Sequence, residues 1–195
     1  MQKNYSFSDY FNMGKPVKEI INEFGYEFCL QKLALPNFEQ PNISLERLKN
    51  QFYKKLPHVS LNSEAAKREF LIAPLLFELL DYVDFDINVE YPLYINERLK
   101  GNLDYFLHSQ QHFLVLEAKN ADLERGFTQL AVELIAVDSF LPQNASPLFG
   151  AITVGDIWRF GKLDRSTKTI YKDIDAFLVP SQLEQLFAVL LGILK

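Results

Sequence analysis

The spacing of hydrophobic side chains along the chain predicts a series of strands after residue 86. Every second side chain is apolar from Ile87 to Ile95, an alternation typical of a strand with one buried face. Two runs rich in Leu, Val, Phe and Tyr follow at 101–107 and 113–119, bounded by Gly-Asn in front and by Asn-Ala-Asp behind. These boundaries predict two more strands. The later runs 148–154, 157–160 and 169–171 predict three further strands.

Helices are predicted where apolar side chains recur every three or four residues. Pro16 opens the first such stretch, which carries Val17, Ile20, Ile21, Phe24 and Phe28. Ser44 caps a basic helix whose inward side chains are Leu45, Leu48, Phe52 and Leu56. A third helix begins at Asn62 or Ser63, a fourth spans 122–140, and a last one spans 181–194.

The order of these elements predicts an α/β fold with a helical N-terminal part. Residues 1–58 are expected to form a helical appendage packed on the core, and residues 59–195 the α/β domain. Its central mixed β-sheet, of four or five strands, is expected to be flanked by helices. Strand 148–154 is reached by a helical crossover, so it is predicted to run parallel to strand 113–119.

Three charged residues interrupt two of the predicted strands. Asp104 lies in the first strand of the pair, and Glu117 and Lys119 lie in the second. Glu117 and Lys119 are two residues apart, so the pleat places them on one face, together with Phe113 and Val115. The alternate positions of this strand are apolar as well, as expected for a central strand covered by helices. Charges at the edge of such a core need a compensating partner.

The short connection between these strands predicts an antiparallel hairpin. If Gln110 and Gln111 form a two-residue turn, paired residues have numbers that sum to 221, and Asp104 lies across from Glu117. Like charges placed directly opposite are destabilising, unless a cation such as Mg²⁺ lies between them. A slip of one residue would move the two acids to opposite faces.

The residues Asp104 and Glu117-Ala118-Lys119, with twelve residues between them, resemble the active-site signature of the PD-(D/E)XK nuclease superfamily. Upstream, the stretch Ser63–Leu76 is similar to the first helix of the nuclease domain at the N-terminus of type I restriction motor subunits. Downstream, Gln129 follows at about the distance of a glutamine that some members carry on the next helix. The resemblance covers about residues 60–160 and implies a restriction-endonuclease-like core.

The resemblance implies a metal-dependent nuclease that hydrolyses phosphodiester bonds in DNA. Asp104, Glu117 and the backbone carbonyl of Ala118 would hold one Mg²⁺ or Mn²⁺ ion, or two ions with Glu64 as a further ligand. Lys119 would orient or help to deprotonate the attacking water. Gln129 would reach toward that water or the substrate phosphate.

Simpler interpretations of the same residues stay open. Glu64 could favour the helix N-terminus and pair with Arg68 four residues on. Gln129 and Glu133 share a helix face one turn apart, and as an exposed pair they would be unremarkable. Glu117 and Lys119 could neutralise each other at a strand end, which would leave Asp104 unexplained. The alternative function is a non-catalytic member of the same fold that binds nucleic acid or protein.

The composition limits the kinds of molecule that the protein is expected to bind. The net charge is −5, with 20 basic and 25 acidic residues, whereas a tight DNA-binding domain usually carries a basic patch. Cys29 is the single cysteine, which fits a reducing, cytoplasmic compartment. The apolar runs are too short to predict a membrane span, and a homodimer stays open.

A nucleotide cofactor is not expected. The stretch from Gly155 to Gly161-Lys162 faintly resembles a phosphate-binding loop, but five residues separate its glycines rather than four. Leu163 stands where such a loop needs Ser or Thr. Neither an ATP-binding site nor a complete restriction motor is predicted.

Overall fold

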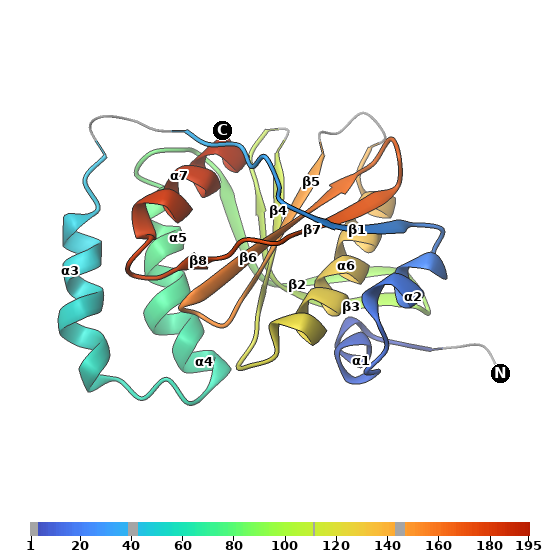
Figure 1. Ribbon diagram of the computed structural model, residues 1–195, viewed down its shortest axis with the longest axis horizontal. Helices are drawn as coiled ribbons and strands as arrows, with labels where there is room; N and C mark the ends of the chain where they lie inside the picture. Colours follow the sequence, from blue (N-terminus) through green and yellow to red (C-terminus); the bar gives the residue numbers. More distant parts are fainter. Residues whose placement is uncertain (1–3, 39–42, 111, 143–146) are drawn as a thin grey trace.

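The computed structural model (Figure 1) describes residues 4–38, 43–110, 112–142 and 147–195. Its helices are α1 (Phe7–Asn12), α2 (Val17–Asn22), α3 (Glu46–Lys55), α4 (Glu64–Lys67), α5 (Ala73–Leu79), α6 (Leu123–Phe140) and α7 (Leu183–Leu194). A 3₁₀ turn, Leu56–His58, follows α3, and a π-helical turn, Arg68–Ile72, joins α4 to α5. Its strands are β1 (Glu27–Gln31), β2 (Asp86–Asn96), β3 (Leu99–His108), β4 (Phe113–Ala118), β5 (Leu148–Thr153), β6 (Ile157–Asp164), β7 (Thr169–Asp173) and β8 (Phe177–Leu178).

All eight strands belong to one open, mixed sheet, so the chain has an α/β fold. The strand order is β1-β7-β6-β5-β4-β3-β2, and β8 pairs with β6. The predicted parallel pairing of β4 with β5 is confirmed. The sheet is larger than the four or five strands expected, because all six strands predicted along the chain belong to it and β1 and β8 join them.

Helices cover both faces of the sheet. In Figure 1, α3, α4, α5 and α7 lie on one side, and α1, α2 and α6 lie on the other. Strand β4 divides its side chains between two hydrophobic cores, with Leu114 and Leu116 in the core beneath α5 and α7 and Val115 in the core beneath α6. The expected division of this strand into two apolar faces is confirmed. Among the described residues, no helix combines the length and apolar character that crossing a bilayer requires.

The N-terminal part differs from the sequence prediction. The helix that follows Pro16 ends at Asn22, and Phe28 lies in β1, which pairs in parallel with β7 at the edge of the sheet. The expectation that Phe24 and Phe28 extend this helix is therefore wrong. Gly25 has φ +80°, a left-handed conformation that ends the helix, and the ring of Phe28 packs edge-on against Phe127 with centroids 6.3 Å apart.

The β3–β4 hairpin has the predicted register. The paired residues run from Tyr105 opposite Leu116 to His108 opposite Phe113, so each pair of numbers sums to 221. The backbone N–H of Ser109 donates to the carbonyl of His112 at 3.0 Å. Residue 111, in the predicted turn, lies outside the described residues.

The helical segment before β2 begins where it was predicted. Ser63 is the N-cap, and its side chain accepts a hydrogen bond of 3.1 Å from the backbone N–H of Ala66. The π-helical turn that begins at Arg68 precedes Pro74, which lacks a backbone N–H. Such turns insert an extra residue into a helix, often beside functional sites. Here the turn begins at Arg68, whose side chain approaches Asp104 and Tyr105 of β3.

Candidate active site

The predicted active-site residues meet where strands β3 and β4 separate. The last pair of the ladder is Tyr105 opposite Leu116, so Asp104 and Glu117 are the next two residues in register. Asp104 is 8% exposed and Glu117 is completely buried. The structure thus brings together the two acids that the hairpin register predicted to be neighbours.

The side chain of Asp104 replaces a backbone partner at this point. Its Oδ2 accepts a hydrogen bond of 2.8 Å from the backbone N–H of Ala118, and its Oδ1 lies 3.7 Å from Nη1 of Arg68. Burial raises the pKa of Asp104, while the Ala118 N–H and the cations of Lys119 and Arg68 oppose that rise. The carboxylate is therefore held in place by the sheet on one side and by the preceding helix on the other.

A second irregularity lies beside Asp104 on strand β2. Glu90, which falls opposite Asp104 between two paired residues of the ladder, has φ +52°, an uncommon conformation for a residue other than glycine. Its carboxylate accepts a hydrogen bond of 2.5 Å from Arg68. Arg68 thus joins the carboxylates of two adjacent strands, instead of serving only as the partner of Glu64.

Glu117 and Lys119 form a buried ion pair. Nζ of Lys119 contacts Oε1 of Glu117, and only 14% of the lysine side chain is exposed. Burial alone would lower the pKa of Lys119, but the neighbouring carboxylates of Glu117, Asp104 and Glu64 raise it. The lysine is therefore kept protonated, and the ring of Phe11 from α1 lies 5.6 Å from its Nζ.

Helix α6 supplies a buried amide behind this ion pair. Nε2 of Gln129 donates to Oε1 of Glu117 at 2.6 Å and to Oε1 of Glu133 at 2.8 Å. The side chain of Gln129 thus binds the Glu117 carboxylate itself.

The structure adds Glu133 to the site. It is completely buried, so the exposed Gln129–Glu133 pair considered from the sequence is wrong. The signal was present in the sequence, because residues 130–132 and 134–137 are all apolar. A helix that is apolar on every side is buried, and an acid within it is buried too.

Three oxygen atoms in this group lack a hydrogen-bond donor. Oε2 of Glu117, Oε1 of Gln129 and Oε2 of Glu133 are buried, and no described residue donates to them. Burial, Glu133 and Asp104 together raise the pKa of Glu117 well above its ordinary range. Burial raises the pKa of Glu133 to about 7.

Glu64 approaches the site from the first turn of α4. Burial raises its pKa, Lys119 lowers it and Asp104 raises it, so the three side chains interact electrostatically. Lys67, on the same turn, donates a hydrogen bond of 2.5 Å to the carbonyl of Asn120, which fixes α4 to the loop after β4. Glu64 therefore faces the same end of the sheet as the other predicted residues.

The oxygen atoms at this site fit a hard divalent cation. Oε2 of Glu117 is buried without a donor, and a cation would compensate it. Among the residues that the structure describes, no three His, Cys, Asp or Glu side chains converge into a metal-binding group. Mg²⁺ is commonly held by one or two carboxylates together with water and substrate phosphates. Asp104 and Glu117 are thus enough carboxylates for it, with the Ala118 carbonyl and Glu64 as further candidates.

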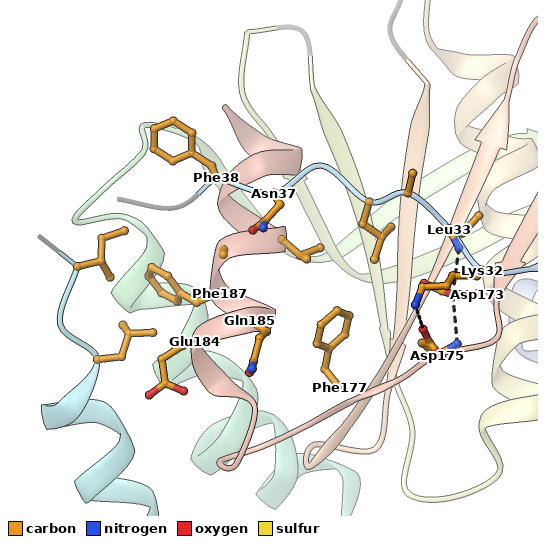
Figure 2. A pocket seen from close by; sticks show the side chains of 16 residues that line it. Lys32, Leu33, Asn37, Phe38, Asp173, Asp175, Phe177, Glu184, Gln185 and Phe187 are labelled. Atoms are coloured by element: carbon orange, nitrogen blue, oxygen red, sulfur yellow. Dashed lines mark hydrogen bonds and ion pairs between the residues drawn. The ribbon is translucent and has the colours of Figure 1, made fainter. Parts of the chain in front are cut away.

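A cavity of about 650 Å³ lies elsewhere in the molecule (Figure 2). It is lined by apolar side chains such as Leu35, Phe177 and Phe187 and lies beside α7, whereas Glu117 faces α6. At its rim, Lys32 pairs with Asp175 at 3.2 Å. Among the described residues that line it, none belongs to the candidate active site.

Comparison with protein-family models, with curated proteins and with solved structures gave no match for this chain. What the chain can do is therefore judged from its own residues.

Proposed function

We propose that the chain is a metal-dependent nuclease of the PD-(D/E)XK superfamily, which hydrolyses phosphodiester bonds in DNA. The observation that carries this proposal is the position of Asp104, Glu117 and Lys119. They lie on two adjacent strands, the two acids are next to each other in register, and all three side chains are almost entirely buried. Acids and a lysine placed at the edge of a core in this way destabilise a fold, so a chemical role accounts for them better than a structural one.

The same proposal extends to the fold. A restriction-endonuclease-like core is supported by the helices that carry Glu64 and Gln129, which flank the strands of Asp104 and Glu117 from opposite faces of the sheet (Figure 1). It is supported as well by the parallel strand β5, which follows α6 and lies beside β4.

Each residue has a defined task in the proposed reaction. Asp104, Glu117 and the Ala118 carbonyl would hold Mg²⁺ or Mn²⁺, with Glu64 at the open side. When bound, such an ion lowers the pKa of a coordinated water and neutralises charge on a phosphate. Lys119 stays protonated beside Glu117, so it stabilises negative charge that develops on the phosphate and positions the attacking water.

The surroundings of the site supply positive charge for a DNA backbone despite the acidic total. Lys67 and Arg68 come from the helix before the site, and Arg125 comes from the first turn of α6 after it. Arg125 is exposed, with 56% of its side chain accessible, and pairs with Asp122 at 3.2 Å. These groups would contact phosphates on either side of the scissile bond.

The test is cleavage of supercoiled and linear DNA in Mg²⁺ or Mn²⁺ by the wild-type protein, Asp104→Ala and Lys119→Ala. Lys49→Ala is the matched control, because Lys49 forms a more exposed ion pair with Glu184 on the opposite side of the sheet. We expect cleavage by the wild type and the control, and none by the two site variants. If the wild type cleaves nothing and neither ion raises its melting temperature, the nuclease proposal is overturned in favour of a binding protein.

A further inference from the structure

A cleft opens beside the candidate active site, between the turn that joins α1 to α2 and the first turn of α6. Its volume is about 270 Å³, and its lining includes Phe11, Gly14, Lys15, Arg125 and Thr128. Helices α1 and α2 both pack on α6, on one side of the sheet (Figure 1). The N-terminal wall of this cleft has no part in the reaction proposed above.

Phe11 connects the cleft to the active site. Its half-buried side chain lines the cleft, and the centroid of its ring lies 5.6 Å from Nζ of Lys119. On the opposite wall, Arg125 is followed by Gly126, where a Cβ would lie 3.1 Å from Cγ of Lys119. Both walls therefore meet at Lys119, so a group bound in the cleft is a neighbour of the phosphate that this lysine would contact.

The turn between α1 and α2 forms the outer rim of the cleft. Helix α1 ends at Asn12, and Pro16 is the N-cap of α2. Between them Gly14 has φ +63°, a left-handed conformation that glycine adopts at little cost. A Cβ on Gly14 would meet no atom within 4 Å, so the turn projects from the fold. It carries Lys15, which is exposed at the rim.

The charges around the cleft suit an anion. Among the described residues that line it, the one acid is Glu124, and two cations share its carboxylate, Arg159 at 3.1 Å and Lys172 at 2.5 Å. Lys15 and Arg125 stand at the rim. The exposed ion pair that Arg125 forms with the N-cap of α6 is of a kind that contributes little. The cleft thus combines positive charge with an aromatic ring.

We propose that this cleft binds an unpaired nucleotide of a DNA strand, next to the phosphate that is hydrolysed. The base packs against the ring of Phe11, and the phosphate of the same nucleotide pairs with Lys15 and Arg125. The substrate is then single-stranded DNA or a single-stranded end. The inference rests on the proposed function for the position of the reacting phosphate, but binding in the cleft requires neither a metal ion nor cleavage.

The size and chemistry of the cleft favour an unpaired base over a duplex. Proteins bind single strands by combining cations along the backbone with aromatic side chains on which bases stack. In a duplex the faces of each base are covered by its neighbours, so the base would first have to be flipped out. The volume lies just below the range of about 300–1,000 Å³ that holds drug-sized ligands, which leaves room for one base.

Binding to a short fluorescein-labelled oligothymidylate tests the inference, by anisotropy in EDTA so that nothing is cleaved. We expect the wild type to bind the single strand about tenfold more tightly than the duplex with oligodeoxyadenylate. Phe11→Leu should weaken single-strand binding by about fivefold to a hundredfold, whereas Phe11→Tyr keeps a ring and should retain it. Phe77→Leu is the matched control, because Phe77 is an exposed aromatic residue of α5 on the other side of the sheet.

The salt dependence of binding tests the phosphate contact separately. Lys15→Gln should reduce the slope of log K against log salt concentration by about 0.7, the value for one phosphate contact on a single strand. Lys18→Gln is its control, because Lys18 is an exposed lysine of α2 that does not line the cleft. Lys15 is exposed, so this test holds even if circular dichroism shows that Phe11→Leu is unfolded.

The outcomes separate the cleft from the nuclease proposal. A wild type that cleaves DNA, while folded Phe11→Leu and Lys15→Gln bind the single strand as tightly as it does, overturns the cleft alone. Tighter binding to the duplex than to the single strand also overturns it. Single-strand binding that depends on Phe11 and Lys15, in a protein that cleaves nothing in Mg²⁺ or Mn²⁺, supports the cleft and overturns the nuclease. No binding to either form of DNA overturns both.

Discussion

The carboxylate of Asp104 takes the place of a backbone carbonyl, because its Oδ2 accepts the hydrogen bond that the N–H of Ala118 donates at 2.8 Å. The residue that precedes Ala118 is Glu117, so one side chain fixes the backbone beside the other acid. The proposed metal ligands are thereby held at a set separation before any ion binds. Such preorganisation is what an electrostatic active site requires.

Two replacements of Asp104 should distinguish its contribution to the stability of the fold from its contribution to cleavage. Asp104→Asn keeps an acceptor for the Ala118 N–H, whereas Asp104→Ala leaves that N–H without its partner, at a cost of about 1–3 kcal/mol. In EDTA we expect urea unfolding to show the larger loss of stability for Asp104→Ala. Both variants should lose cleavage. Equal stability of the two variants would show that the hydrogen bond contributes nothing.

Lys119 should stabilise the fold mainly at neutral and alkaline pH. Lys119→Met leaves the buried carboxylate of Glu117 without its cation, and breaking a buried pair in this way costs about 3–5 kcal/mol. At pH 5 the loss should be smaller, because burial and the neighbouring acids raise the pKa of Glu117 and a proton then replaces the missing charge. Urea unfolding at pH 5 and pH 8 measures the difference.

The control for this experiment is Lys49→Met. Its partner Glu184 is half exposed, and exposed pairs contribute about 0–1 kcal/mol. A Lys119→Met protein that loses no more stability than this control would contradict the role of Lys119 in compensating Glu117.

The metal-free protein should lose stability as the pH rises from about 4.5 to about 7. Burial raises the pKa of Glu133 to about 7 from an ordinary value of 4.5, so in this range the folded state binds more protons than the unfolded state. Stability therefore falls with pH through this window, by roughly 3 kcal/mol at most. Glu133→Gln should flatten the dependence, as measured by urea unfolding in EDTA between pH 4.5 and pH 8.

Divalent cations should reverse this loss. Ionised carboxylates bind Mn²⁺ and protonated ones do not, so the gain in melting temperature on adding Mn²⁺ should be larger at pH 8 than at pH 5. Burial raises the pKa of both proposed ligands, Asp104 and Glu117, so a gain that does not depend on pH would contradict their assignment.

Gly126 should control the position of Lys119. A Cβ at this residue of α6 would lie 2.6 Å from Cδ1 of Ile152 and 3.1 Å from Cγ of Lys119. Gly126→Ala therefore moves both side chains, and overpacking of this kind costs about 1–3 kcal/mol, less the gain in helix propensity of about 1 kcal/mol. We expect a lower cleavage rate with all charges unchanged.

Gly150→Ala is the matched control for Gly126→Ala. Its Cβ would meet Leu130 and Leu134 at 3.0 to 3.1 Å, so it crowds the same core without contacting Lys119. The control should lose stability and keep its cleavage rate. Equal rates for the two variants would contradict the proposed link between Gly126 and Lys119.

The sequence predicted best what depends on near neighbours in the chain. The alternation from Ile87 to Ile95, the short connection after His108 and the apolar stripe of α6 each determine an element locally. The hairpin register followed from the length of the turn, and with it the position of Asp104 beside Glu117. These predictions needed no knowledge of distant partners.

What the sequence did not predict depends on distant contacts. The apolar residues from Val17 to Phe28 fit a helical period throughout, yet Phe28 belongs to a strand because β7 offers it a partner across the sheet. An exposed position was considered for Glu133, because the sequence does not show that α6 is covered on more than one side. Helices α1 and α2 pack on α6 opposite the strands and complete that cover.

The pairing of β1 with β7 has a consequence for biosynthesis. Glu27 pairs with Thr169 and Gln31 with Asp173, so β1 leaves the ribosome about 140 residues before its neighbour β7 exists. At about 5–20 residues per second, that delay lasts many seconds, during which Phe28 has no place in the sheet. Strand β1 therefore reaches its final position only after β7 has been made, although it is synthesised long before β7.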